Sequence, residues 1–169
     1  MNIERASKKH LSMIEDFALA CMSDSTANYA RAVKDPEEYL DFIIDRSTWP
    51  EESESGLLPC TTYFAVQGSR IVAAIRLRSG RNKAADEIHG YIGYETRPSE
   101  RNKGIAKFLL KWVTENILES ETLVAVEESN IGSQKVLESV NAQYVKSAID
   151  PIEKTTMVFY EVAPNRPHT

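Results

Sequence analysis

"ETRPSERNKGIAKFLLKWV", residues 95–113, joins an extended segment to a helix through a short basic loop. Apolar residues then recur at steps of three and four, which is the spacing of a helix buried along one face. This set is Ile105, Phe108, Leu109, Trp112, Val113 and Ile117. The spacing predicts a helix that begins at Gly104, directly after the basic loop.

The basic loop has the chemistry of an anion site. A helix N-terminus leaves about four backbone N–H groups without internal partners and carries the positive end of the helix dipole. Gly104 lets a ligand approach the main chain, and Ala106 keeps the next exposed position small. Arg101 and Lys103 add positive charge, which suits a polyphosphate better than a single carboxylate. The stretch therefore predicts a loop that binds a pyrophosphate.

The remaining chain alternates between helix and strand patterns. Before the loop we expect an edge strand near Ile3, two helices and a hairpin. The helices carry Leu11 to Cys21 on one face, and a capped start at Asp35 and Pro36. The hairpin is Tyr63 to Val66 with Ile71 to Leu77, and His89 to Thr96 forms a third central strand. After the loop we expect a buried strand at 122–126, a helix capped by Asn130, and strands at 143–148 and 155–162.

This order predicts the fold class, an α/β protein with a mixed central sheet flanked by about four helices. A right-handed crossover through the helix after Gly104 would make the strands at 89–96 and 122–126 parallel. The chain has 169 residues, so we expect one domain over residues 1–169.

Composition excludes several classes of function. A net charge of -5 argues against a nucleic-acid surface, which needs clustered Lys and Arg. No apolar run has the length of a signal peptide core or a bilayer span, so we expect a cytoplasmic protein without a membrane partner. Cys21 and Cys60 are too few and too far apart for a disulfide framework or a metal site, and we expect no metal.

The segment RNKGIA at residues 101–106 fits the R/Q-x-x-G-x-G/A signature of the GNAT superfamily of N-acetyltransferases. The longer stretch GYETRPSERNKGIAKFLL resembles that family's acetyl-CoA-binding segment, and ESNIGSQKVLESVNAQYV resembles its next segment. The sequence has neither a G-x-x-x-x-G-K-[ST] loop nor a G-x-G-x-x-G fingerprint. The resemblance implies acetyl-CoA as cosubstrate and a primary amine of a small molecule, protein or peptide as acceptor.

The resemblance also implies the residues that bind the cosubstrate. Backbone groups of the loop would hold the pyrophosphate, and main-chain groups of the preceding strand would pair with the pantetheine arm like an added strand. Asn130 would bond to the same arm, and Ser133 would lie on the adenosine side. The full set is Glu95, Thr96, Arg97, Arg101, Asn102, Lys103, Gly104, Ile105, Ala106, Asn130 and Ser133.

Acetyl transfer needs a neutral amine, so a base or a water chain must take a proton from the acceptor. His89 and Glu95 are the candidates for the base on or near the third central strand. The family's frequent acid is a Tyr that would protonate the leaving thiolate, but that position is Leu137 here. Tyr94, Tyr91 or Ser133 could replace it, or the thiolate could leave without a donor.

Two functions compete with acetyl transfer. The missing Tyr at Leu137 keeps open a non-catalytic acyl-CoA-binding or sensor module, and a partner-binding domain with a vestigial loop is the third alternative. Trp49 and Pro50 either line an acceptor pocket or cover the helices nearby. Exposed C-terminal strands could pair two copies, so a homodimer is a further expectation.

Overall fold

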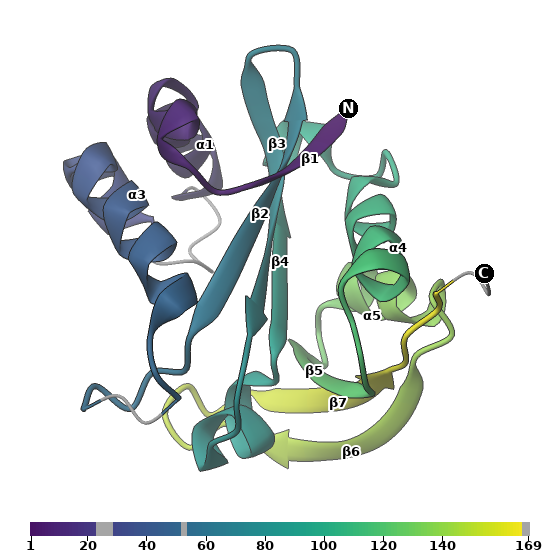
Figure 1. The fold of residues 1–169 in the computed structure, drawn as a ribbon. Coiled ribbons are helices and arrows are strands. Elements are labelled where there is room, and N and C mark those ends of the chain that lie inside the picture. Colours follow the sequence, from purple (N-terminus) through teal and green to yellow (C-terminus); the bar gives the residue numbers. More distant parts are fainter. Residues whose placement is uncertain (23–28, 52–53, 167–169) are drawn as a thin grey trace. The chain divides into compact units, whose positions relative to one another are not determined.

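The computed structural model describes residues 1–22, 29–51 and 54–166, and Figure 1 draws the chain as a ribbon. The strands are β1 (Asn2–Arg5), β2 (Cys60–Gln67), β3 (Arg70–Arg78), β4 (Ile92–Thr96), β5 (Thr122–Glu127), β6 (Gln143–Ile149) and β7 (Thr156–Val162). The α-helices are α1 (Leu11–Met22), α2 (Ala30–Lys34), α3 (Pro36–Asp45), α4 (Ile105–Asn116) and α5 (Ile131–Glu138). Short turns of helix are η1 (Lys8–His10), η2 (Arg46–Thr48), η3 (Ala85–His89) and η4 (Pro98–Glu100).

Contacts divide the chain into two compact units. The first unit is Met1–Gly80 with Tyr94–Ile105, and the second is Arg81–Gly93 with Ala106–Thr169. No helix in residues 1–22, 29–51 and 54–166 is long and apolar enough to cross a membrane. The elements follow the predicted order, with α2 as one additional short helix, and the predicted mixed α/β fold class is confirmed.

The first unit is built on a sheet of order β1-β2-β3-β4. The β2–β3 hairpin turns at Gly68, and its register pairs Phe64 with Ala74. Helices α1 and α3 lie on one side of this sheet (Figure 1), where Phe17, Leu40 and Phe64 form part of one apolar core. The predicted cap of α3 is confirmed, because the Asp35 side chain accepts a hydrogen bond from the Glu38 amide at 3.0 Å.

The second unit is built on a sheet of order β5-β7-β6, in which both pairs are antiparallel. Helix α5 is joined to β7 by the hydroxyl of Tyr160, which donates to Gln134 Oε1 at 3.2 Å. The C-terminal segment is joined to α4 by the Asn165 amide, which donates to the Thr114 carbonyl at 2.8 Å. Leu109 and Val113 of α4 are fully buried, as the helical spacing predicts, but Phe108 is exposed and Leu110 is buried instead.

The strand prediction at 89–96 was wrong at its beginning. His89 ends the π-helical turn η3 and is exposed, and β4 begins only at Ile92. The predicted parallel pair is absent from the ladders of the described residues, where Gly90 and Val124 instead form an isolated antiparallel bridge. Gly90 has φ +62, so the chain turns there rather than continuing as a strand.

Gly90 is packed against the backbone of β5, and a side chain has no room there. A Cβ at this position would lie 2.6 Å from the Ala125 nitrogen and 3.0 Å from the Leu123 oxygen. We therefore expect Gly90→Ala to destabilise the protein by about 2–4 kcal/mol, from overpacking and from a side chain at positive φ. Urea unfolding measures this change.

The matched control is Gly68→Ala in the β2–β3 turn. Gly68 also has φ +62, but a Cβ there meets nothing within 4 Å. It therefore isolates the cost of backbone strain, about 1–2 kcal/mol. Equal effects of the two substitutions would contradict the close approach at Gly90.

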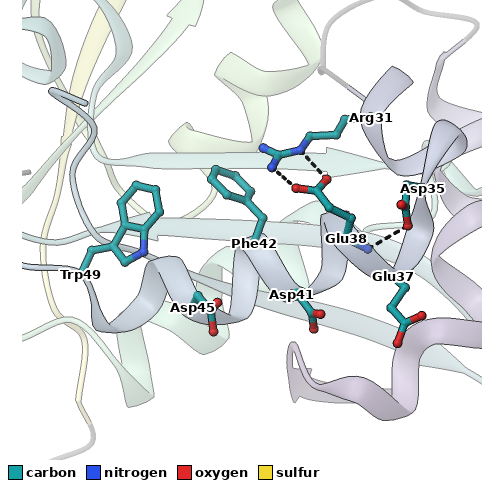
Figure 2. A pocket seen from close by; sticks show the side chains of 8 residues that line it. All are labelled: Arg31, Asp35, Glu37, Glu38, Asp41, Phe42, Asp45 and Trp49. Atoms are coloured by element: carbon teal, nitrogen blue, oxygen red, sulfur yellow. Dashed lines mark hydrogen bonds and ion pairs between the residues drawn. The ribbon is translucent and has the colours of Figure 1, made fainter. Parts of the chain in front are cut away.

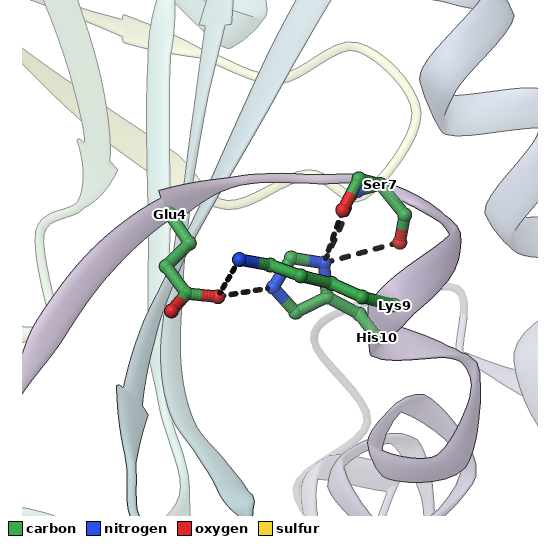
Figure 3. Close-up of polar contacts among 4 residues, drawn as sticks. All are labelled: Glu4, Ser7, Lys9 and His10. Carbon is green, nitrogen blue, oxygen red and sulfur yellow. Dashed lines mark hydrogen bonds and ion pairs between the residues drawn. The ribbon is translucent and has the colours of Figure 1, made fainter.

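Glu4, Ser7, Lys9 and His10 form a small polar cluster at the start of η1 (Figure 3). The Ser7 amide donates to Nδ1 of the fully buried His10 at 3.1 Å, so the ring proton lies on Nε2. Nε2 donates to Glu4 Oε2 at 2.9 Å, and Lys9 Nζ lies 2.9 Å from the same oxygen. The hydrogen bond from Lys9 and then that from His10 lower the pKa of Glu4 below its usual value of 4.5.

Because the pKa of Glu4 is lowered in the folded state, the Glu4 carboxylate makes the stability of the protein depend on pH in the acid range. Its stabilisation is present above the unfolded pKa and is lost as pH falls through the folded pKa. We expect Glu4→Gln to remove up to about 1 kcal/mol at pH 7 and to flatten the fall of stability below about pH 5. Urea unfolding from pH 7 to pH 3 tests this, with the exposed Glu121→Gln as control. An unchanged acid slope would contradict it.

Candidate functional site

The loop between β4 and α4 has an unusual backbone. After β4, the Arg97 amide donates to the Val72 carbonyl at 2.9 Å, and the η4 turn closes through Glu100 and Arg101 amides. Asn102 and Gly104 then both have positive φ, at 61 and 78. Left-handed residues in a turn direct successive N–H groups toward one point, an arrangement known as an anion-binding nest. We call residues 101–106 the cradle.

Several amides of the cradle are available to a ligand. Within the part of the chain that the structure describes, the amides of Asn102, Lys103 and Gly104 donate to no protein acceptor. Ile105 and Ala106 begin α4, so their amides belong to the unpaired first turn. The cradle thus presents consecutive donors at the positive end of a helix. The Arg101 amide differs, because it donates to the Pro98 carbonyl at 3.3 Å.

Charged side chains of the cradle are held by neighbours in the first unit. Lys103 Nζ lies 2.9 Å from Glu100 Oε2, and this hydrogen bond lowers the pKa of Glu100. Arg101 Nε donates to the Thr96 carbonyl at 3.3 Å, and its Nη2 lies 3.9 Å from Glu95 Oε1. The structure therefore brings together three of the predicted site residues, Glu95, Thr96 and Arg101.

Arg97 has a structural role that the sequence did not reveal. Its side chain is buried, with Nη2 donating to Asp16 Oδ2 at 2.6 Å and Nε donating to the Ile71 carbonyl at 3.1 Å. Arg97 thus ties the beginning of the loop to α1 and β3. Its amide bonds to Val72, so the predicted contribution of Arg97 to the pantetheine would come from other main-chain atoms.

Glu95 lies in an enclosed part of the first unit. Its side chain is only 8% exposed. Burial and then the negative charge of Glu95 raise the pKa of Cys21 to about 12. Burial also raises the pKa values of Tyr29 and Tyr39, so both phenols keep their protons at neutral pH. The negative charge of Glu95 is a lesser cause of both shifts.

Arg76 is the positive neighbour of this group. Its Nη2 donates to the Tyr29 hydroxyl at 3.0 Å, and the neighbouring Tyr29, then Tyr39 and Glu95, raise its pKa. Sequence reasoning missed Arg76, although the pattern RLR at 76–78 in an apolar strand was a usable signal. Tyr94 follows the alternation of β4 and lies on the face opposite Glu95.

The predicted residues of the second unit have local partners of their own. Asn130 caps α5 as predicted, since its Oδ1 accepts from the Ser133 amide at 3.0 Å. His89 lies in η3, and the hydrogen bonds from the Ile152 and Glu153 amides, with a smaller influence of the nearby His89, lower the pKa of Asp150. Leu137 is fully buried, and its hydrocarbon side chain has no proton to donate to a thiolate.

Tyr91, one of the alternative acids, is buried and paired with the half-exposed Asp86. Its hydroxyl donates to Asp86 Oδ1 at 2.7 Å, and burial raises the pKa of the phenol. Arg81 also lies 3.4 Å from Asp86 Oδ1. These contacts hold the phenol against Asp86 in the second unit.

An acidic pocket of about 450 Å³ lies along α3 (Figure 2). Trp49 is one of the residues that line this pocket. Its ring also packs edge-on against Phe42 of α3, with 5.6 Å between ring centroids, so Trp49 contacts the helix as well. Glu38 is paired with Arg31, and Asp41 is paired with Lys8. Because these carboxylates already have partners, the pocket does not by itself indicate a ligand. The described residues contain no group of three His, Cys, Asp or Glu that could hold a metal ion.

The structure resembles several solved acetyltransferases. A GNAT-family acetyltransferase from Bacillus cereus is 16% identical with a TM-score of 0.65, and 98% of each chain is covered. The ribosomal-protein-S5-alanine acetyltransferase from Vibrio fischeri is 10% identical with a TM-score of 0.70, covering 96% of this chain and 92% of its own. YncA of Salmonella typhimurium, assigned as an acetyltransferase and solved with its cofactor acetyl-CoA, is 11% identical with a TM-score of 0.63, covering 99% and 96%.

No curated protein matches the sequence significantly. The Acetyltransferase (GNAT) family, in contrast, matches residues 21–141, which include β4, the cradle, α4, β5 and α5. The match therefore covers most of the chain and contains the loop in which the amides of Asn102, Lys103 and Gly104 donate to no protein acceptor among the described residues. The chain belongs to the GNAT acetyltransferase family.

Proposed function

We propose that the protein is an acetyl-CoA-dependent N-acetyltransferase that transfers an acetyl group to a primary amine by direct attack on the thioester. The cradle carries this proposal. Its consecutive unpaired amides at the start of α4 suit the pyrophosphate of acetyl-CoA, and a Cβ at Gly104 would meet nothing within 4 Å. The acetyl-CoA in the similar yncA structure supports the same ligand.

Main-chain groups of β4 would bind the pantetheine arm. β4 is the last strand of the first sheet, and the Arg97 amide points to β3. Because main-chain groups alternate along a strand, those of Thr96 point away from β3, as the contact of its carbonyl with Arg101 also indicates. An extended arm can add to such an edge as a strand. Asn130, with its Oδ1 used as a cap, would offer Nδ2 to the ligand.

Glu95 would act as the general base, directly or through a water molecule. A protonated alkylamine has a pKa of about 10.4, so the acceptor must lose a proton before it attacks. Acetyl-CoA supplies the activated acetyl group when it is bound. Glu95 would accept the proton, with Arg101 Nη2 3.9 Å from its Oε1 and the charge of Arg76 nearby to orient the carboxylate. His89 and Tyr94 remain weaker candidates, because His89 is exposed in η3 and Tyr94 lies on the other face of β4.

A non-catalytic acyl-CoA-binding module is the second candidate, and the buried Leu137 favours it because no acid is available there. Calorimetric titration with acetyl-CoA and CoA, followed by thiol release with a panel of amines, separates the two. Micromolar binding with thiol release supports the enzyme, and binding without release to any amine supports the module. Absence of binding would overturn both. A cytoplasmic location, a single domain over residues 1–169 and pairing of two copies stay predictions.

A further inference from the structure

The side chain of Arg97 is buried at the point where the loop toward the cradle begins. Among the lysines and arginines of the described residues, Arg97 is the one that is buried, with 4% of its surface exposed. Its Nη2 donates to Asp16 Oδ2 at 2.6 Å, its Nε donates to the Ile71 carbonyl at 3.1 Å, and its guanidinium lies 5.9 Å from the centre of the Phe17 ring. All four residues belong to the first unit. Arg97 therefore fixes the beginning of the loop to two elements at once, α1 and β3.

Packing alone does not explain a guanidinium at this position. A buried charge has a high desolvation cost, and an apolar side chain of similar volume is often as stable or more stable at such a place. The arginine differs from an apolar residue in having donors with fixed directions, here one toward a carboxylate of α1 and one toward a carbonyl of β3. Apolar contacts have no direction. These bonds therefore set the position of the chain at Arg97 more closely than packing would.

The centre of the cradle has a strained backbone without amide hydrogen bonds of its own. Asn102 and Gly104 have positive φ. The amides of Asn102, Lys103 and Gly104 donate to no acceptor in the part of the chain that the structure describes. A non-glycine residue with positive φ is strained, and it persists only where the surrounding structure imposes it. The conformation of the cradle therefore depends on the residues that flank it.

The hydrogen bonds on the β4 side of the cradle lead back to Arg97. Its amide donates to the Val72 carbonyl at 2.9 Å, and its carbonyl accepts from the Glu100 amide at 2.8 Å. The carbonyl of the next residue, Pro98, accepts from the Arg101 amide at 3.3 Å, which closes η4 directly before the centre of the cradle. The main chain of Arg97 thus begins the turn that leads into the cradle, and its side chain fixes that beginning to α1 and β3.

We propose that Arg97, held by Asp16, is a positioning residue for the cosubstrate, and that its side chain keeps the cradle in the conformation that binds the pyrophosphate of acetyl-CoA. The inference rests on the proposed function, because the cradle is the proposed pyrophosphate site. Backbone donors bind an anion best when they are already aligned, since no free energy is then lost in ordering the loop. A buried side chain that bonds to Asp16 and Ile71 acts through the loop and not by contact with the ligand.

Calorimetric titration with acetyl-CoA tests this role in variants of Asp16. Asp16→Ala removes the carboxylate that accepts from the guanidinium, and alanine favours a helix, so α1 should persist. We expect the affinity to fall roughly tenfold or more, because a misaligned cradle must be ordered by the ligand. Asp16→Asn keeps a side-chain oxygen that can accept, so it should lose less.

Glu15→Ala is the matched control, because Glu15 is exposed on the same helix, next to Asp16. Both alanine variants remove one negative charge, and this change by itself favours an anionic ligand. Glu15→Ala should therefore bind acetyl-CoA at least as tightly as the original protein. A weaker affinity in Asp16→Ala alone reports the position of the cradle and not the charge of α1.

Arg97→Met separates positioning from stability. Methionine replaces the guanidinium with an apolar side chain, and Asp16 is 66% exposed, so no buried charge is left unpaired. We expect thermal unfolding close to that of the original protein, with roughly tenfold weaker binding of acetyl-CoA. For any amine that gives thiol release, KM for acetyl-CoA should rise while kcat at saturating acetyl-CoA changes less than about threefold. Where Arg97→Met does not fold, Asp16→Ala decides the test.

Two results would overturn the inference. One is that folded Asp16→Ala and Arg97→Met bind acetyl-CoA as tightly as Glu15→Ala, because Arg97 would then serve stability alone. The other is a fall in kcat with an unchanged KM for acetyl-CoA. Absence of acetyl-CoA binding by the original protein would instead overturn the proposed function.

Discussion

Gly104→Glu is expected to reduce the affinity for acetyl-CoA at least a hundredfold, while the protein stays folded. The new carboxylate would occupy the centre of the cradle, where the amides of Asn102, Lys103 and Gly104 donate to no acceptor in the described part of the chain. It would repel the pyrophosphate and compete for its donors. Position 104 is open, with no atom within 4 Å of a Cβ, so the steric cost to the fold is small. Calorimetric titration with acetyl-CoA measures the effect.

Gly68→Glu is the matched control for this experiment. Gly68 has φ +62, close to φ +78 at Gly104, and its Cβ would also meet nothing within 4 Å. Both substitutions should therefore cost about 1–2 kcal/mol of stability through backbone strain. Only Gly104→Glu should lose binding. If both variants bound acetyl-CoA as tightly as the original protein, the cradle would not be the pyrophosphate site.

Glu95→Gln is expected to reduce kcat roughly a hundredfold or more, with the affinity for acetyl-CoA changed only a few-fold. The amide has nearly the shape of the carboxylate but cannot accept the acceptor's proton, and general base catalysis contributes about 10²–10⁴-fold. Thiol release at saturating acetyl-CoA, combined with calorimetric titration, separates the loss of chemistry from a loss of binding.

Three further variants test whether the loss of kcat is specific to Glu95. Glu115→Gln removes one carboxylate from α4, where it pairs with Lys111 at 3.7 Å, and should leave kcat unchanged. His89→Gln and Tyr94→Phe should each have a smaller effect than Glu95→Gln, given their places in η3 and on the other face of β4. A larger loss in either variant would move the base or acid role from Glu95 to that residue.

Much of the cradle could be predicted from the sequence because its causes are local. The apolar spacing after Gly104 indicates α4, and a helix N-terminus always presents unpaired amides. Asp35 and Asn130 were identified as caps for the same reason, since a cap bonds to an amide three residues away. Local signals of this kind do not depend on the rest of the fold.

His89 shows where local reasoning failed. The residues at 89–96 have strand composition, yet Gly90 turns the chain and His89 falls in η3. The cause is the backbone of β5, whose Ala125 nitrogen approaches Gly90 so closely that a Cβ could not fit. A contact between residues more than thirty positions apart in the sequence cannot be predicted from the residue pattern of a single strand. The predicted alternation of His89 with Glu95 therefore did not hold.

The sequence by itself determined the element order apart from α2, the helix caps and the turn that leads into α4, because each depends on residues a few positions apart. Tertiary structure alone decided the surroundings of Glu95 and the role of Arg97. Arg97 is buried against Asp16, 81 positions away, and Arg76 bonds to Tyr29, 47 positions away. A charged side chain is buried only where the folded chain supplies its partners, and these partners come from elements that local sequence patterns do not connect.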